Sequence, residues 1–405
     1  MFIIKTSIPK NNLPFAVIIL LASLSALVAA AIDMYLPAFP TVAEKLEISV
    51  GQVQQTLTVF LIGLGVGQAI YGPLLDRFGR KAPLLGGLAL FVIGSIAAAF
   101  SNSFETLLIA RFVQALGASA GSVAGRAVVS DTCDTQESAR VFSILGQVMM
   151  LAPILAPMIG GLVLIYADWQ VIFWVMAAIG AVSLLLTMRH LPETLAVEKR
   201  VPLSLVTIIH GYLRQLIQPG FFFYTMAIGA TFGFIFIYVG SAPFAFIDSF
   251  NLSPTQFSFL FAANAATMIA MSQVNMRLLK RFSANQLLYA GLLAFVACGL
   301  ALSAVIQWGQ VNLWSYALLL ALSIGTTGFI TGNMFAATMA SVKENAGTAS
   351  ALLGVMQFSI GGGLGYVVSL FTPHIIWLPL SFAVLGFAAL VFCILGKQLT
   401  PADPA

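Results

Sequence analysis

Residues 14–38, with the sequence PFAVIILLASLSALVAAAIDMYLPA, form an apolar stretch whose one charged residue is Asp33. A membrane-spanning helix needs roughly 20 mainly apolar residues, because it rises about 1.5 Å per residue across a hydrocarbon layer about 30 Å thick. The stretch meets that length and exceeds the apolar run of about 7–15 residues that is typical of a cleaved signal peptide. We therefore expect it to form the first helix of a membrane domain.

Further stretches of this kind follow along the chain and predict an all-α membrane protein with twelve transmembrane helices. The expected spans lie near residues 14–38, 52–75, 82–100, 105–129, 141–166, 169–188, 220–243, 255–276, 286–306, 312–340, 349–371 and 375–396. An even number of spans places both termini on the same side of the membrane.

The composition of the 405 residues supports this class, since 60% of them are hydrophobic and 8% are charged. Soluble proteins carry about 25% charged residues, so the composition excludes soluble enzymes, disulfide-rich secreted domains and disordered chains. The formal charge of +4 is spread among apolar runs, without the basic stripe that a nucleic-acid partner requires. The three cysteines are scattered and predict neither a disulfide framework nor a metal site.

The basic residues predict the orientation, because lysines and arginines are enriched in cytoplasmic loops. With a cytoplasmic N-terminus, only Lys45 of the 18 basic residues falls in an outside loop. Arg111 and Arg126 fall within a span, and all the others lie inside. We expect a multi-pass protein of the bilayer with both termini in the cytoplasm.

The longest inside segment divides the chain into a six-helix bundle over 1–188, a cytoplasmic linker over 189–219 and a second six-helix bundle over 220–405. A weak internal repeat supports the division, because LLDRF at 74–78 matches LLKRF at 278–282, about half the chain later. Such a spacing is typical of pseudo-symmetric halves related by an axis along the membrane normal.

Short motifs connect this pattern to a known family. GPLLDRFGRK at 72–81 resembles the signature loop of the major facilitator superfamily. DMYLP at 33–37, RFVQALG at 111–117 and AGTAS at 346–350 resemble the Bcr/CflA group of bacterial drug:proton antiporters. The resemblance implies the superfamily's fold, a location in the bacterial inner membrane, a monomer, and transport driven by the proton gradient without a cofactor.

Asp33 is the candidate for proton coupling. A charged side chain at membrane depth costs at least about 2.5–3.5 kcal/mol, so it normally faces the bundle interior or a water-filled cavity. Arg111 is its expected electrostatic counterpart, and Gln114, three residues further on the same helix face, is expected to share the network. The alternatives are that the first span ends early, which leaves Asp33 among the headgroups, and that Arg111 satisfies backbone carbonyls.

The resemblance also implies a cytoplasmic gate in the 72–81 loop. Asp76 would face the start of a later helix near Gly347, and Arg80 would pair with Asp131. The alternative is a loop that serves only as a positive-inside anchor. The residues assigned to this gate are Gly72, Asp76, Arg77, Gly79, Arg80 and Asp131.

The fifth span resembles the antiporter motif of the superfamily, a run that ends in Gly-Pro-x-x-Gly-Gly. Its matching residues are Pro153, Pro157, Gly160 and Gly161, whereas Ala156 stands where the motif prefers glycine. Proline bends a helix and glycine lets helix backbones approach closely. An ordinary packing helix is the alternative.

The candidates for an adaptable apolar cavity are Tyr35, Met149, Met150, Phe234 and Tyr238. Methionine suits such surfaces because it is flexible and polarizable. The alternative is that these side chains face lipid or pack against their neighbours.

These features predict a proton-coupled exporter of small hydrophobic or cationic compounds, including antibiotics, that works by alternating access. One alternative is a proton-linked transporter of a specific metabolite, such as an amino acid, a sugar or a peptide. Another is a receptor or scaffold that transports nothing, which would leave Asp33 and the 72–81 loop unexplained.

Overall fold

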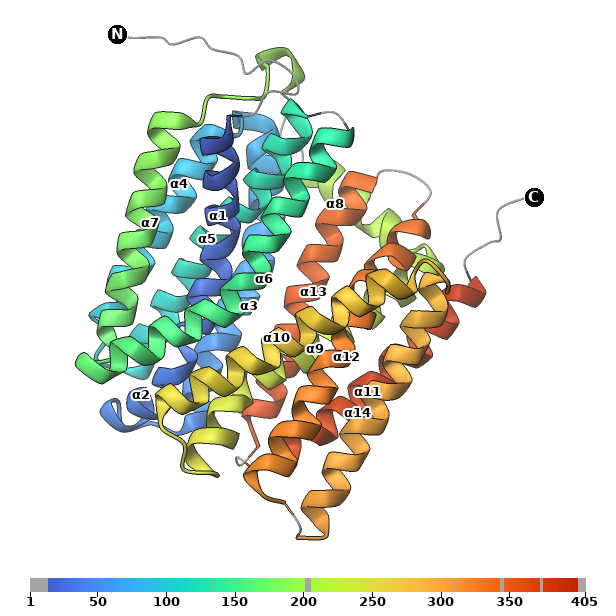
Figure 1. Cartoon of the computed structure of the whole chain (residues 1–405). Helices are drawn as coiled ribbons and strands as arrows, with labels where there is room; N and C mark the ends of the chain where they lie inside the picture. The colour runs from blue at the N-terminus through green and yellow to red at the C-terminus, as the bar shows by residue number, and fades with distance from the viewer. Residues whose placement is uncertain are drawn as a thin grey trace. The chain divides into compact units, whose positions relative to one another are not determined.

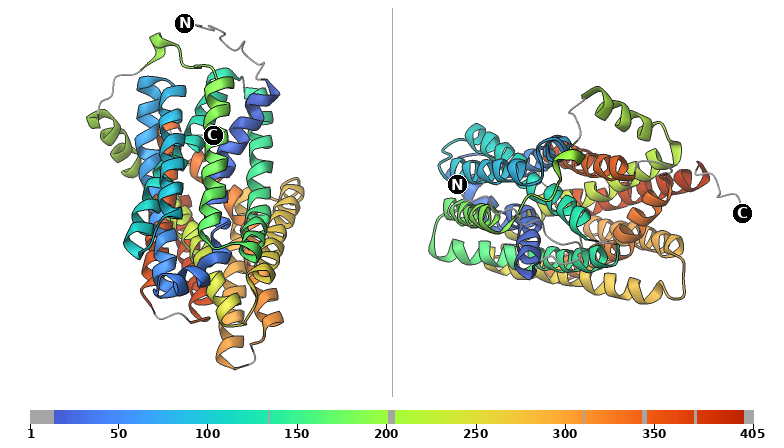
Figure 2. Two further views of the ribbon diagram at one scale, coloured as in Figure 1. Left: turned by 90° about the vertical axis from the view of Figure 1, so that its left-hand side faces the viewer. Right: turned by 90° about the horizontal axis from the view of Figure 1, so that it is seen from above.

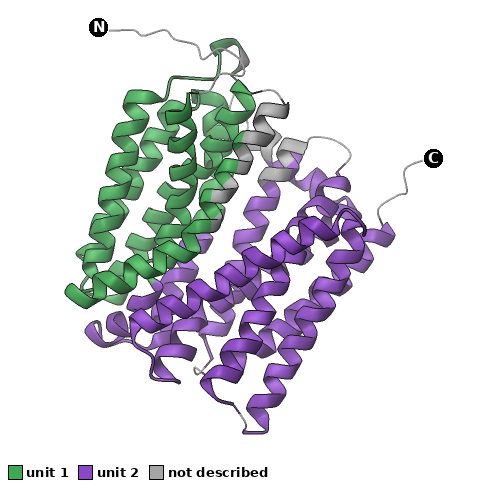
Figure 3. Ribbon diagram, in the orientation of Figure 1, with its two compact units in different colours: residues 1–35, 63–205 green, residues 36–62, 206–405 purple. Residues whose placement is uncertain are grey.

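The computed structural model describes residues 14–133, 135–200, 205–309, 311–342, 346–371 and 374–399. These residues form helices joined by short turns, and no strand occurs among them (Figure 1). Two compact units can be distinguished, residues 1–35 with 63–205 and residues 36–62 with 206–405 (Figure 3). The helices of each unit can be followed from two other sides in Figure 2.

The first unit contains the helices that carry most of the predicted site residues. They are α1 (Phe15–Asp33), the second half of α3 (Val50–Phe78), α4 (Lys81–Ala99), α5 (Phe104–Thr132), α6 (Thr135–Tyr166) and α7 (Gln170–His190), followed by the short turn η2 (Val197–Lys199). Within this unit α4 packs against α5 and α7, and α1 packs against α5, α6 and α7.

The second unit contains the later helices and the segment that follows α1. Its elements are η1 (Leu36–Ala38), α2 (Phe39–Lys45), the first half of α3, α8 (Leu205–Leu216, from its second residue), α9 (Pro219–Pro243), the π-helical turn η3 (Phe244–Asp248), α10 (Pro254–Leu278), α11 (Ala284–Gln307), α12 (Leu313–Ala340), α13 (Ala346–Ser369) and α14 (Trp377–Leu399). In this unit α9 packs against α13 and α14, and α12 packs against α10 and α11.

Helix α3 belongs to both units, and for this reason the observed units differ from the expected 1–188 and 220–405 division. In its first half, the Leu61 Cβ lies 3.3 Å from the point where a Cβ on Gly362 of α13 would stand. In its second half, a Cβ on Gly63 would lie 2.8 Å from the Ala115 Cβ of α5. The first half of α3 therefore packs on α13, and η1 packs on α9 and α10, which groups 36–62 with the later helices.

The expected spans agree with the observed helices to within a few residues in most cases. Within the described residues, eleven helices are long and apolar enough to cross a membrane, counting α1 to α2 and α9 to η3 as continuous spans. Helix α6 has 32 residues and corresponds to the expected span at 141–166. Its described apolar part is Leu151–Tyr166. The protein is thus an all-helical, multi-pass membrane protein.

Two boundaries differ in ways that matter for the site. Helix α3 continues through Gly72 and Pro73 to Phe78, so the expected loop over 72–81 is reduced to the turn at Gly79 and Arg80. Helix α1 ends at Asp33, whereas the expected span continued to residue 38. The chain after it stays buried through Leu36, Pro37 and Ala38.

Several helices begin where a polar side chain satisfies the first backbone N–H groups. In each capping box, the residue before the helix accepts a hydrogen bond from the third helical N–H, and the third side chain reaches back. The pairs are Ser103 with Thr106 for α5, Ser253 with Gln256 for α10, Ser283 with Gln286 for α11, and Asn312 with Ser315 for α12.

Helices α4 and α5 approach closely because glycines stand at their contact. A Cβ added to Gly117 of α5 would lie 2.6 Å from the Gly87 carbonyl oxygen and 2.7 Å from the Phe91 Cα, both on α4. A Cβ on Gly94 of α4 would lie 2.5 Å from the Gln114 backbone nitrogen. Any side chain at these positions must push the two backbones apart.

We expect Gly117→Ala to destabilise the protein by about 1–3 kcal/mol, as overpacking does elsewhere, and to lower its unfolding temperature in detergent. Gly86→Ala on α4 is the matched control, because nothing lies within 4 Å of its added Cβ. In that variant the better helix propensity of alanine leaves stability unchanged or raises it by up to about 1 kcal/mol. Equal unfolding temperatures for the two variants would contradict the close contact.

Candidate functional site

Asp33 lies at the C-terminal end of α1, where the Met34 N–H closes the last turn on the Ala30 carbonyl at 3.1 Å. Its side chain is buried, with 5% of its surface exposed, although the helix ends there. The early end of the helix therefore does not bring the carboxylate to the surface. Within the described residues, no hydrogen bond or ion pair joins the Asp33 carboxylate to another side chain.

Helix α6 packs directly against the end of α1 beside this carboxylate. A Cβ added to Gly160 would lie 3.0 Å from the Met34 carbonyl carbon and 3.2 Å from its Cα. Pro153 and Pro157 lie inside the same helix, where each removes one backbone N–H. Gly161 is buried next to Gly160. The small residues of the expected antiporter motif therefore allow contact between α6 and the residue that follows Asp33.

Arg111 is fully buried on α5, and it binds Gln114 rather than Asp33. Its Nη1 donates to the Gln114 Oε1 at 2.6 Å, and the Gln114 Nε2 donates to the Ser95 Oγ of α4 at 2.8 Å. No ion pair between Arg111 and Asp33 occurs among the residues that the structure describes. The expected sharing between Arg111 and Gln114 is thus present, and the expected direct pairing with Asp33 is not.

Two aromatic rings also face the Arg111 guanidinium. Its central carbon lies 5.0 Å from the centroid of the Tyr35 ring and 5.7 Å from that of Phe173. A cation over a ring face is attracted by the ring's quadrupole, by about 2 kcal/mol or more where water is excluded. Arg111 therefore joins the segment after α1 to α4, α5 and α7.

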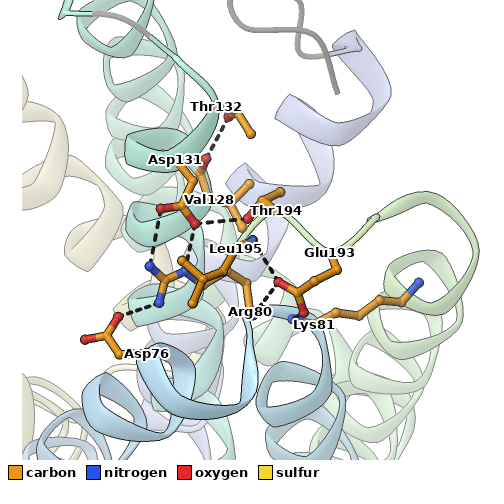
Figure 4. A network of polar contacts seen from close by, with 9 residues as sticks. All are labelled: Asp76, Arg80, Lys81, Val128, Asp131, Thr132, Glu193, Thr194 and Leu195. Carbon is orange, nitrogen blue, oxygen red and sulfur yellow. Dashed lines mark hydrogen bonds and ion pairs between the residues drawn. The ribbon is translucent and has the colours of Figure 1, made fainter. Parts of the chain in front are cut away.

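Arg80 is the centre of a second polar cluster, at the turn between α3 and α4 (Figure 4). Its Nε donates to the Asp131 Oδ2 at 2.8 Å, its Nη2 to the Asp131 Oδ1 at 3.3 Å, and its Nη1 to the Asp76 Oδ1 at 2.5 Å. The side chain of Arg80 is 9% exposed, that of Asp131 is 18% exposed, and that of Asp76 is 58% exposed. The pair implied by the resemblance, Arg80 with Asp131, is thus formed in the structure.

The environment keeps Arg80 charged. Burial by itself lowers the pKa of Arg80, but its hydrogen bonds and charge attraction to Asp131 and Asp76 outweigh burial, so the pKa is raised above its usual value. Asp131 lies in the last turn of α5, where the negative end of the helix dipole disfavours an acidic group. The guanidinium offsets this unfavourable placement.

The other residues assigned to the gate have varied positions. Gly79 has φ of +92°, a left-handed conformation that glycine adopts without strain, and it makes the turn. Arg77 is exposed in the last turn of α3, and Gly72 has open space where a Cβ would stand. The approach of Asp76 to the helix start near Gly347 involves both units and stays a prediction.

Two of the cavity candidates are fully buried. Phe234 is fully buried, with its ring centroid 4.1 Å from that of Phe295 and 6.0 Å from that of Phe382. Tyr35 is also fully buried, against Phe173 at 5.2 Å. Both rings pack on other aromatic side chains within their units, and that they line a cavity stays a prediction.

The remaining cavity candidates differ in exposure. Tyr238 is 5% exposed, and its hydroxyl accepts a hydrogen bond from the Asn264 Nδ2 at 2.9 Å. Met149 is 49% exposed on α6. Met150 lies in the same helix, and its side chain is outside the described residues. Asn264 was not predicted, and an asparagine within the expected span at 255–276 was the signal that would have found it.

Sequence reasoning also missed Glu193 and Thr194, which the structure places beside Arg80 (Figure 4). They belong to the Leu191–Leu195 segment that follows α7. The sequence feature that could have indicated them was the absence of a capping residue before α4, since the start of that helix then needs a partner from another segment. Among the described residues, no group of three His, Cys, Asp or Glu side chains is arranged to hold a metal ion.

We expect Arg80→Ala to slow substrate turnover about tenfold and to leave the apparent substrate affinity unchanged, because Asp131 loses its cation. Arg80→Lys should recover only part of the rate, since an ammonium lacks the fork that reaches Asp131 and Asp76 together. Initial transport rates at several substrate concentrations separate these effects. The control is Arg189→Ala, which changes an exposed residue in the last turn of α7. Full activity of Arg80→Ala would contradict a gating role and leave the turn only a role in setting the membrane orientation.

Comparison with known proteins agrees with the motifs. A family model described as "Major Facilitator Superfamily" matches residues 21–366. The MFS-type transporter YdgK of Bacillus subtilis is 36% identical over 356 residues, which cover 87% of this chain and 88% of the relative. The bicyclomycin resistance protein homolog of Haemophilus influenzae is 32% identical over 357 residues, with 88% and 89% of the two chains covered.

A more distant relative and a solved structure extend the comparison. The chloramphenicol resistance protein of Pseudomonas aeruginosa is 28% identical over 388 residues, which cover 92% of this chain and 90% of the relative. A crystal structure of a D-xylose-proton symporter superposes with a TM-score of 0.78 at 13% identity, and covers 96% of this chain and 98% of that one. At that identity the likeness concerns the fold alone.

Proposed function

Because the chain belongs to the major facilitator superfamily, as the match over residues 21–366 establishes, we propose that it exports small hydrophobic or cationic compounds in exchange for protons. The relatives named for bicyclomycin and chloramphenicol resistance support antibiotics as members of the substrate class. The proposed cycle is alternating access in the inner membrane of a bacterium. It is performed by a monomer with both termini in the cytoplasm, and it needs no cofactor.

The observation that carries the proposal is the burial of Asp33 at the end of α1. Desolvation favours the neutral, protonated form of a carboxylate, and water reaching the site favours the charged form. A change in hydration during the cycle therefore makes Asp33 take up and release a proton. A cationic or polar substrate competes with that proton for the same carboxylate.

The position of Asp33 suits this exchange. The residue lies where α1 ends, and the buried turn η1 begins at Leu36. The contact of Gly160 with Met34 links α6 to this helix end, so a movement of α6 changes the surroundings of Asp33. The proposed role of Arg111 is indirect, through Tyr35, whose ring it faces at 5.0 Å two residues after Asp33.

The proton gradient is a sufficient energy source. Its electrical part supplies about 2.3 kcal/mol per elementary charge for each 100 mV of membrane potential. Exchange of one proton for a neutral drug moves one charge inward and thus uses this term in full. The gate proposed around Arg80 would keep the cytoplasmic side closed while the site faces outward.

We expect Asp33→Asn to abolish proton-driven drug transport while the protein still folds, because an amide cannot exchange a proton. The test uses inverted vesicles with an imposed proton gradient and compares chloramphenicol uptake with that of the wild type. Equal amounts of variant in the membrane and an equal unfolding temperature control for folding. Undiminished uptake would remove Asp33 from the mechanism.

The substrate class is tested by growth inhibition of cells that overproduce the protein. The proposal expects raised resistance to chloramphenicol or bicyclomycin, and loss of that resistance when a protonophore collapses the gradient. Unchanged sensitivity to both compounds, together with proton-linked uptake of a sugar, amino acid or peptide, would instead favour a metabolite transporter.

A further inference from the structure

The start of α4 lacks a capping side chain of its own. Its N-cap residue is Arg80, whose side chain makes no capping hydrogen bond, and its first residue is Lys81. The first N–H groups of a helix have no partner within it, and a positive charge at this end opposes the helix dipole. By local sequence alone this helix start is unfavourable.

Glu193, from the segment after α7, supplies the missing cap. The backbone N–H of Arg80 donates to the Glu193 Oε1 at 2.8 Å, and that of Lys81 donates to its Oε2 at 3.2 Å. The Leu195 N–H donates to the same Oε1 at 3.0 Å, which holds the carboxylate in its own loop. A carboxylate in this position satisfies orphan donors and complements the dipole.

A second contact runs in the opposite direction, from the start of α4 to the end of α7. The Lys81 Nζ donates to the Met188 carbonyl oxygen at 2.9 Å, in the last turn of α7. A cation at the C-terminal end of a helix is favourable for the same reason that an anion is favourable at the start. The start of α4 and the end of α7 thus each provide the charge that the other needs.

The neighbouring residue Thr194 contacts the ion pair itself. Its Oγ1 donates to the Asp131 Oδ2 at 3.1 Å, the oxygen that also accepts from the Arg80 Nε at 2.8 Å (Figure 4). Glu193 therefore holds the backbone of Arg80, and Thr194 holds the carboxylate that its side chain binds. Two consecutive residues fix both members of the pair.

The turn at Gly79 is shaped to admit Glu193. A Cβ at position 79 would lie 2.7 Å from the Glu193 Cδ, and the φ of +92° independently disfavours a side chain there. The approach of the carboxylate therefore depends on a glycine, although the two residues are far apart in the chain.

We propose that Glu193 and Thr194 are positioning residues that connect the linker to the Arg80 cluster. The inference rests on the proposed transport function. Beyond Leu195 the chain leads through η2 to α8 and the second unit. Displacement of the linker pulls Glu193 from the start of α4 and Thr194 from Asp131, and this frees Arg80 to change partner. The position of the linker thereby determines whether Arg80 keeps its partners in the proposed gate.

Amide hydrogen exchange of the full-length protein tests the cap without any substrate. In Glu193→Ala, we expect the amides of residues 80–82 to exchange about five- to tenfold faster, because the first turn of α4 opens more often. Glu198→Ala is the matched control, since Glu198 is an exposed acid in the same linker. Equal exchange in the two variants would overturn the proposed cap.

Transport kinetics test the connection to the gate. With chloramphenicol as the probe, we expect Glu193→Ala and Thr194→Val to slow turnover about three- to tenfold without changing the apparent affinity. Thr194→Ser, which keeps the hydroxyl, should restore the rate. Because a smaller amount of active protein would also lower the rate without changing the affinity, each rate is divided by the amount of folded protein in the membrane.

A double-mutant cycle separates positioning from an independent effect. Once Arg80→Ala has removed the side chain that Thr194 helps to place, Thr194→Val should cause little further loss of turnover or of unfolding temperature. Additive losses in both measurements would overturn the inference. If the wild type transports no chloramphenicol, the proposed substrate fails, whereas the exchange experiment and the unfolding-temperature cycle still decide the role of Glu193 and Thr194.

Discussion

The ion pair between Arg80 and Asp131 joins the turn after α3 to the end of α5, and the arrangement of the proposed gate depends on it. Two helix ends meet there with charges that are unfavourable by themselves: an acid at the end of α5 and two basic residues at the start of α4. Each charge is offset by a residue from another segment. The stability of the cluster is therefore a property of the assembled turn, and it disappears when one segment leaves.

Asp33 and Arg111, two buried ionisable residues of the first unit, have different surroundings. Arg111 donates a hydrogen bond to an amide oxygen and faces two aromatic rings. Asp33 has no comparable side-chain partner among the described residues. A buried carboxylate without such partners changes its protonation state more readily when water reaches it. This contrast supports assigning proton exchange to Asp33 and a structural contribution to Arg111.

The sequence predicted the helices well because a membrane sets one length requirement that every span must meet. It did not predict α8, since a helix of 12 residues lies below that length. The Arg80–Asp131 pair was found through a motif, but Glu193 was missed because the missing cap before α4 does not indicate which distant residue supplies it. The burial of Phe234 against Phe295 could not be predicted, because an aromatic residue in an apolar helix looks the same in sequence in a packed core as on a cavity wall.

The contact between Gly79 and Glu193 has a consequence for the evolution of such chains. A substitution at position 79 displaces the carboxylate, and loss of the carboxylate removes one reason to retain the glycine. Selection at either position then depends on the residue at the other. Among homologous transporters the two positions should therefore covary. Sequences that have lost the acid at position 193 should also tolerate residues other than glycine at position 79.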